Sequence, residues 1–113
     1  MKLDQNPSLA TILRAVSNSR RFSILSWLPE SAETRVKVFH SGRARSGAEI
    51  DQIARNFNIS VNTVRKHMVL LHRADLVALV RKDGKPIYHR NESMIAKIVG
   101  QHGLSFILQP PLD

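Results

Sequence analysis

The stretch ISVNTVRKHMVLLHRADL, residues 59–76, combines amide, hydroxyl and cationic side chains at helical spacing. On a helix that turns about 100° per residue, one side carries Asn62, Lys66, Val69 and Arg73, and the other carries Val61, Val64, Met68 and Leu71. Asparagine can pair with adenine through two hydrogen bonds, and arginine or lysine can pair with guanine. The polar stripe therefore has the chemistry of a helix that reads DNA bases, although an ordinary solvated helix face has a similar composition.

A second group of cations follows in the stretch LVALVRKDGKPIYHR, residues 76–90. It reads as a strand, a tight turn at DGKP and a returning strand, because DG between alternating apolar residues is typical of a hairpin. A basic hairpin beside a groove-sized helix can grip the flanking DNA backbone or minor groove. The candidate DNA-binding residues are Ser60, Asn62, Thr63, Arg65 and Lys66 on the helix and Arg81, Lys82 and Lys85 on the hairpin.

Net charge favours a polyanionic partner over a neutral one. The 113 residues carry a formal charge of +8, with a pI near 10.9. Residues 61–90 hold seven Lys or Arg against two Asp or Glu. A strongly basic balance in a small protein favours nucleic acid as the partner, with solubility alone as the simpler explanation.

Helix-capping residues and the spacing of apolar residues predict the helices around this stretch. Asn6 with Pro7 predicts the start of a first helix, and Ser19 the start of a second that ends at Pro29. Residues 30–45 favour an extended segment, although a helical face also fits them. The Ser46–Glu49 spacing predicts a capping box that opens a helix over 47–57. A further helix is expected after Asn91.

The turn FNIS, residues 57–60, sets the angle between two of these helices. Asn58 tolerates the left-handed conformation that ends a helix, and Ser60 can cap the next helix at once. Two helices joined so closely must cross steeply. We expect one mainly α domain over residues 1–113, with a helix-turn-helix at about 47–74, a β-hairpin wing at about 76–90 and terminal helices for dimerisation.

Most of residues 9–100 resemble the winged helix-turn-helix of the ArsR-type bacterial repressors. The resemblance lies in Ile53-Ala54, Ile59-Ser60, Thr63-Val64, His67, Leu70-Leu71, Ala74-Asp75-Leu76-Val77, Gly84 and Tyr88, with a lead-in at ILRAVSNSRRFSILSWL. It implies a transcriptional regulator, in particular a repressor, that binds an inverted-repeat operator as a homodimer. The second strand and the turn of the wing would contain Tyr88 and Gly84.

Two departures from that family bear on the details of the prediction. Asp75 stands where the family usually has glycine, and residues 30–45 are longer than the usual link. The family's metal sensors use cysteines, or carboxylate and histidine pairs in the last helix. This chain has no cysteine and only His102 near its last helix, so we expect neither a thiolate metal sensor nor any cofactor. His67 is expected at the edge of a helix interface.

Apolar runs near both ends of the chain favour the homodimer independently. They comprise Leu9, Ile12, Leu13 and Val16, then Ile95, Ile98, Val99, Leu104 and Ile107. The alternative is that they complete the core of a monomer. In a two-fold dimer the reading helices lie about 34 Å apart, which is why the operator should be an inverted repeat.

Other functions fit the sequence less well. A winged helix can instead bind a protein partner without specific DNA binding. RNA binding is disfavoured because Tyr88 is the single aromatic residue in 61–90 and offers little stacking surface. No paired carboxylates, phosphate loop or Ser-His-Asp pattern favours an enzyme. Without an apolar run of about 20 residues or a signal peptide, a cytoplasmic location and no membrane partner are expected.

Overall fold

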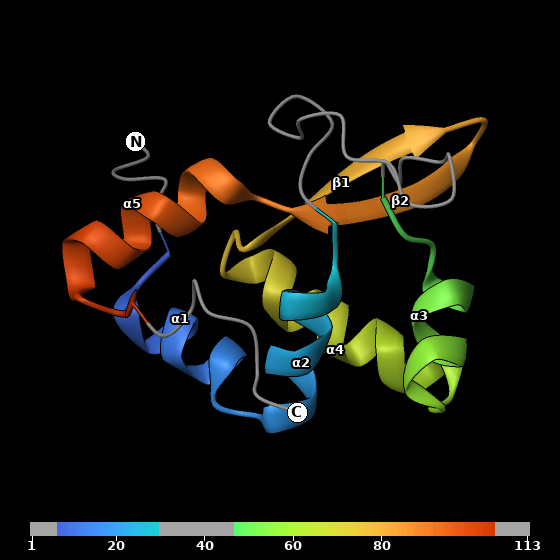
Figure 1. Ribbon diagram of the computed structural model, residues 1–113, viewed down its shortest axis with the longest axis horizontal. Coiled ribbons are helices and arrows are strands. Elements are labelled where there is room, and N and C mark those ends of the chain that lie inside the picture. Colours follow the sequence, from blue (N-terminus) through green and yellow to red (C-terminus); the bar gives the residue numbers. More distant parts are fainter. Residues whose placement is uncertain (1–6, 30–46, 106–113) are drawn as a thin grey trace.

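The computed structural model describes residues 7–29 and 47–105. Within these residues the chain forms five helices and one antiparallel hairpin (Figure 1). The elements in chain order are α1 (Leu9–Val16), α2 (Ser19–Trp27), α3 (Ile50–Phe57), α4 (Val61–Arg73), β1 (Val77–Lys82), β2 (Lys85–Arg90) and α5 (Glu92–His102). The expectation of a mainly α fold with a small β-hairpin is therefore confirmed.

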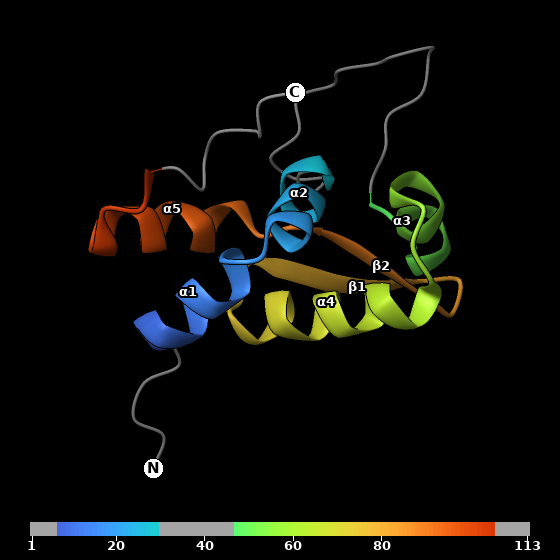
Figure 2. The same cartoon turned by 90° about the horizontal axis from the view of Figure 1, so that it is seen from below.

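The elements are arranged around the long helix α4. Figures 1 and 2 show α1 and α5 at one end of the molecule, with α3 and the hairpin turn at the other. The hairpin runs alongside α4, and the N-terminal half of α4 lies at the same end as the hairpin turn (Figure 2). Residues 30–45, which the sequence favours as an extended segment, lie outside the described residues.

The core is formed by one face from each helix and the start of the hairpin. Its fully buried large side chains include Ile12, Ile24, Leu25, Ile53, Val64, Met68, Leu71, Leu76, Val77, Ile95 and Ile98. In α4 the buried residues are Val64, Met68 and Leu71, at the i, i+4, i+7 spacing of a helix stripe. This burial confirms which side of α4 packs inward, and it leaves the polar stripe outside.

The first two helices begin at other residues than the sequence predicts. The N-cap of α1 is Ser8, whose side chain accepts from the Thr11 backbone N–H, whereas Asn6 lies outside the described residues. The N-cap of α2 is Asn18, which accepts from Arg21 N–H at 2.9 Å, and not Ser19. Both corrections exchange one capping side chain for a neighbour of equal capping strength, because serine and asparagine serve almost equally well.

Helix α3 begins three residues later than the predicted 47–57. Its N-cap is Glu49, which forms a capping box with Gln52, so the predicted role of Glu49 as the third residue of the helix is wrong. Ser46, the predicted cap, lies outside the described residues. The reason lies in the two preceding residues. Ala48 exchanges two backbone hydrogen bonds of 2.8 Å with Tyr88 of β2, and this pairing holds the chain extended up to Glu49.

Gly47 lies directly against β2 in the same short pairing. A Cβ at this position would come within 2.0 Å of Ile87 Cγ2. Only glycine therefore allows the 47–48 segment to approach the sheet this closely.

Two turns contain non-glycine residues in the left-handed conformation. Asn58 ends α3 with φ +56°, as its residue type predicts. Asp75 has φ +62°, so it adopts the backbone conformation for which the glycine of the ArsR-type pattern would be suited. Its carbonyl accepts from Asn91 Nδ2 at 3.0 Å, which ties this turn to the start of α5.

The hairpin closes through Asp83 and Gly84, with φ values of +54° and +79°. Two positive values describe a tight turn that matches the twist of the flanking strands. The strands pair from Val77 opposite Arg90 to Lys82 opposite Lys85. The returning strand thus begins at Lys85, inside the predicted DGKP turn.

Candidate nucleic-acid interface

Helix α4 presents its polar stripe to the outside. Asn62, Arg65 and Lys66 are all exposed, and they occupy its first two turns. Farther along the same stripe Val69 is 47% exposed, and Arg73 is also exposed. The residues predicted to read bases therefore lie on an accessible surface, at the end of α4 that adjoins the hairpin turn (Figure 2).

Ser60 and Thr63 hold the beginning of this helix. Ser60 caps α4, as predicted, and its Oγ accepts from the Thr63 backbone N–H at 3.1 Å. The same hydroxyl donates to Thr63 Oγ1 at 2.9 Å. The proton of Ser60 and one of its two lone pairs are thus engaged within the protein, whereas the Thr63 hydroxyl retains its own proton for a further acceptor.

Asn62 and Arg65 contact each other on the exposed stripe. Arg65 Nη1 donates to Asn62 Oδ1 at 3.4 Å, which is near the limit of a hydrogen bond. The pair leaves the Asn62 amide N–H groups and most of the Arg65 guanidinium N–H groups directed to solvent or a ligand. A ligand that offers better acceptors can displace so long a contact easily.

The hairpin turn concentrates positive charge. Arg81, Lys82 and Lys85 are exposed, and Arg81 Nη1 donates to the Gly84 carbonyl at 3.3 Å. Lys82 and Lys85 are directly opposite each other across the two strands. Like charges in this position destabilise a hairpin. The stability of the hairpin therefore does not explain this pair of lysines, whereas binding of an anion would.

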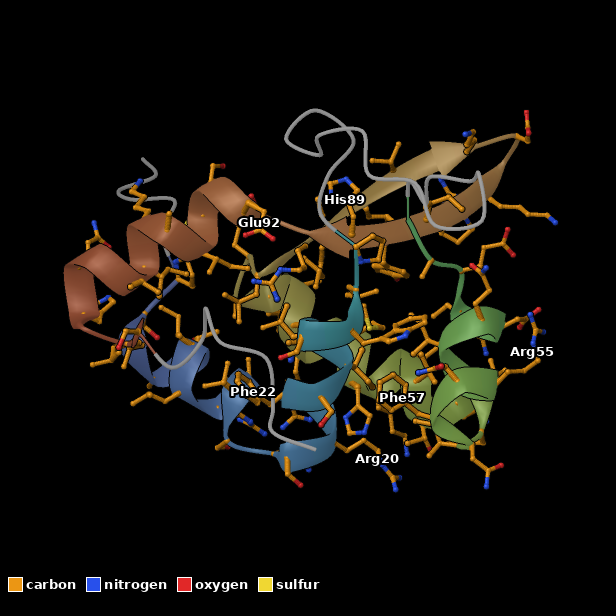
Figure 3. All side chains as sticks on the ribbon, viewed as in Figure 1. Arg20, Phe22, Arg55, Phe57, His89 and Glu92 are labelled. Atoms are coloured by element: carbon orange, nitrogen blue, oxygen red, sulfur yellow. The ribbon has the colours of Figure 1, made fainter. Side chains whose placement is uncertain are left out.

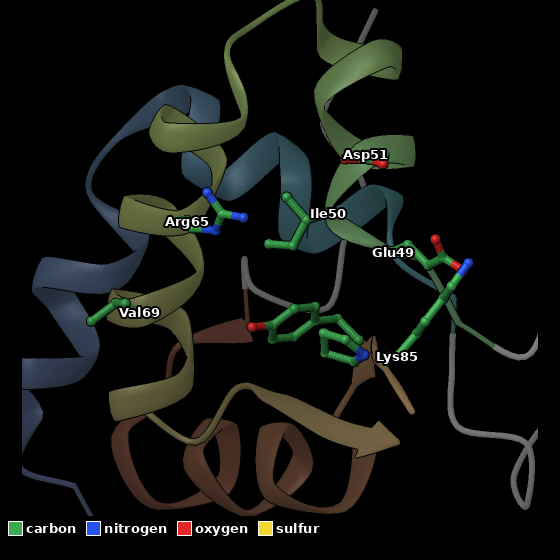
Figure 4. Close-up of a pocket in the computed structure, with 8 residues that line it drawn as sticks. Glu49, Ile50, Asp51, Arg65, Val69 and Lys85 are labelled. Carbon is green, nitrogen blue, oxygen red and sulfur yellow. The ribbon is translucent and has the colours of Figure 1, made fainter. Parts of the chain in front are cut away.

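Helix α4 and the hairpin border a common hollow of about 410 Å³. Arg65 and Val69 of α4 line one side, Lys85, Pro86 and Tyr88 of β2 line another, and Glu49, Ile50 and Asp51 at the start of α3 complete it (Figure 4). Arg65 and Lys85 thus place one helix cation and one hairpin cation at the same hollow, together with the carboxylates of Glu49 and Asp51. The sequence did not predict this hollow.

Below this surface, Arg21 connects α4 to the first two helices. The Arg21 side chain is buried, and its Nε donates to the Ala15 carbonyl at 2.7 Å. Its Nη2 donates to the Arg14 carbonyl at 3.1 Å, and its Nη1 lies 3.1 Å from His67 Nδ1. A guanidinium has no acceptor, so Nδ1 of His67 must be the unprotonated nitrogen. His67 is half-buried, in agreement with its predicted place at a helix interface. Arg20, the neighbour of Arg21, lies at the start of α2 (Figure 3).

Another contact connects α2 to α3. The rings of Trp27 and Phe57 meet edge to face, with centroids 5.6 Å apart, and Figure 3 shows Phe57 on the side of α3 that faces α2. Edge-to-face geometry is a favourable arrangement of aromatic rings. This contact packs α3 against α2 and so helps to hold α3 in its position beside α4.

The environment of His67 makes the stability of the protein depend on pH. Burial, and then the charges of Arg21 and Arg20, lower the pKa of His67 below its usual value of 6.5. Because the unfolded chain then binds a proton more readily than the folded one, stability is lost as pH falls below about 6.5. We expect the free energy of unfolding, measured with urea, to fall less between pH 7 and pH 5.5 in His67→Asn than in the original protein. Asparagine Oδ1 can replace Nδ1 as acceptor without titrating, and equal pH slopes would contradict this assignment.

Within residues 7–29 and 47–105, no three histidine or acidic side chains gather closely enough to hold a metal ion. His102 ends α5 and is exposed. None of the described helices has the length and apolar character needed to cross a membrane.

Helix α3 packs against α4 across the short turn between them, and the hairpin that follows packs beside α4; this arrangement decides the architecture. The fold is a winged helix-turn-helix. Two solved structures share it: reduced HlyU from Vibrio cholerae, with 18% identity and a TM-score of 0.54 over 82% of this chain and 86% of that one, and NolR from Sinorhizobium fredii, with 22% identity and a TM-score of 0.56 over 90% of this chain and 85% of that one.

No family model and no curated protein matches the sequence. At these identities the similarity establishes the winged helix-turn-helix fold of this chain. In the terms of that fold, α3 and α4 form the helix-turn-helix and β1–β2 form the wing. All eight candidate residues lie on α4, at its cap or on the wing.

Proposed function

We propose that the protein is a sequence-specific double-stranded DNA-binding transcriptional regulator that acts as a homodimeric repressor. One observation carries the proposal: Asn62, Arg65 and Lys66 are exposed on one stripe of α4, and Arg65 borders the same hollow as Lys85 of the wing. In this arrangement α4 enters the major groove, where base edges present a distinct pattern for each base pair. The wing cations contact phosphates beside it.

The wing supports this proposal through an energetic argument. Lys82 and Lys85 repel each other across the hairpin, and a phosphate between or beside them would relieve that repulsion. Thr63 offers a hydroxyl proton, and the N-terminus of α4 attracts a phosphate. Ser60 contributes by holding this N-terminus in place and not by donating its own proton.

The homodimer and its inverted-repeat operator are part of the proposal. Leu9 and Leu13 lie one turn apart on α1 and are 41% and 42% exposed, so they are available for a partner. The protein's own core buries four other residues of the two apolar runs, Ile12, Val16, Ile95 and Ile98. Fewer apolar side chains are therefore available for dimerisation than the sequence suggests. The ArsR-type assignment rests on the sequence resemblance and on the Asp75 turn, and it belongs to this proposal.

Lys85→Ala separates DNA binding from stability. Loss of the repulsion with Lys82 should stabilise the hairpin by a few tenths of a kcal/mol, while loss of a phosphate contact should weaken binding. We expect specific and random duplexes to be weakened alike, and the slope of log affinity against log salt to become shallower by about one for each lost contact. Fluorescence anisotropy over a salt series measures this. An unchanged slope would mean that Lys85 does not meet phosphate.

A protein-binding module is the second candidate function. Leu79 and Val80 on β1 are 39% and 48% exposed, so the wing also offers apolar surface. The same titrations distinguish the two functions, because a module of this kind would show no salt-sensitive binding to DNA at micromolar protein.

A further inference from the structure

The outer stripe of α4 contains one residue that charge and polarity do not explain. Val69 is 47% exposed, although its neighbours on the stripe, Lys66 and Arg73, are cations. It lies seven residues after Asn62 and three after Lys66, so it shares their side of the helix. Exposure of an apolar side chain to water is unfavourable, and burial of Val69 against a ligand would remove that cost.

Val69 also lines the hollow between α4 and the wing. It follows Arg65 by one helical turn along the wall of that hollow, with Lys85 on the opposite side (Figure 4). The hollow itself is lined by two cations, Arg65 and Lys85, and by two carboxylates, Glu49 and Asp51, so its own charges balance. The exposed cations before and after Val69 on the stripe, Lys66 and Arg73, favour a polyanion as the partner of this face. An apolar group carried by a polyanion would therefore suit Val69.

Duplex DNA offers one group of this kind on its major-groove edge, the 5-methyl of thymine. Resting on the DNA-binding function proposed above, we propose that Val69 determines specificity by packing against a thymine methyl group. Asn62 and Lys66 read hydrogen-bonding edges toward the start of α4, and Val69 reads an apolar one a turn or two farther along. Each half-site should therefore contain a thymine next to the bases that Lys66 reads. This thymine should lie toward the C-terminal end of α4, where Val69 follows Lys66.

The test begins with a 25–30 base-pair duplex enriched from a randomised library by the full chain. Each thymine of that duplex is replaced singly by deoxyuridine, which removes the methyl and leaves every hydrogen-bonding edge intact. We expect one thymine in each half-site at which this replacement weakens binding about threefold to fourfold, the factor for one buried methyl group. Val69→Ala should bind the thymine and uracil forms of that duplex equally.

Val80→Ala is the matched control, because Val80 is 48% exposed and lies on β1. It should retain the full preference for thymine over uracil. Thermal unfolding of both variants verifies that the fold is intact, which the exposure of both side chains favours.

Three results would overturn the inference. If no thymine shows methyl dependence, or if the dependence survives in Val69→Ala, Val69 does not read the methyl group while the regulator function stands. If no duplex is enriched over random DNA, the DNA-binding function and the inference fail together.

Discussion

Replacement of Arg21 by methionine is expected to lower the free energy of unfolding by about 3 kcal/mol. The change removes hydrogen bonds to the Arg14 and Ala15 carbonyls and to His67. Methionine fills a similar volume, but it leaves the Ala15 carbonyl and His67 Nδ1 without the Arg21 donor, and such a loss costs about 1–3 kcal/mol for each group. The Arg14 carbonyl still accepts from Ser17 Oγ at 3.2 Å. Urea unfolding followed by circular dichroism measures the effect.

Arg20→Met is the control for this variant, since it removes the same charge from the adjacent, exposed position. Its expected effect is within about 0.5 kcal/mol, as for most surface substitutions. Similar losses in the two variants would show that net charge matters here, and not the hydrogen bonds that join α1 and α2 to α4.

The second large effect is expected in DNA discrimination. Asn62→Ala and Lys66→Ala should each reduce the preference for the enriched duplex over random DNA by about tenfold, since a well-placed base contact contributes about 1–3 kcal/mol. Affinity for random DNA should change little in Asn62→Ala, because asparagine carries no charge. It should fall modestly in Lys66→Ala through the lost cation.

Lys97→Ala serves as the charge control for Lys66→Ala, because Lys97 is exposed on α5 at the other end of the molecule (Figure 1). Competition binding with labelled specific duplex and unlabelled random duplex yields the ratio directly. A ratio lowered as much by Lys97→Ala as by Lys66→Ala would point to general electrostatics.

Much of this fold could be predicted from the sequence because its signals are local. The apolar spacing of Val64, Met68 and Leu71 determines the inner face of α4, and Asn58 and Ser60 mark a turn through their own backbone and hydroxyl chemistry. The DG pair predicts the hairpin for the same reason. These signals need no knowledge of what packs nearby.

Features that depend on distant partners could not be predicted. The start of α3 is displaced because Ala48 pairs with Tyr88, forty residues later in the chain. Arg21 resembles any surface arginine in the sequence, and its role depends on His67 in α4. The exposure of Val69 inside a hollow likewise depends on how β2 lies beside α4.

The candidate site was predicted as a set of residues, and the structure adds their arrangement. Arg65 of the helix and Lys85 of the wing border one hollow, whereas Ser60 holds the start of α4. A sequence motif indicates residue types but not which hydrogen-bonding capacities the fold has already used.

The proposed function requires that the outer face of α4 reads bases. The most direct test is the ratio of affinities for the enriched duplex and for a scrambled duplex of equal composition, measured at one salt concentration for the original protein and for Asn62→Ala. We expect the ratio to fall about tenfold in the variant while affinity for the scrambled duplex is unchanged. An unchanged ratio in a folded Asn62→Ala variant would contradict it.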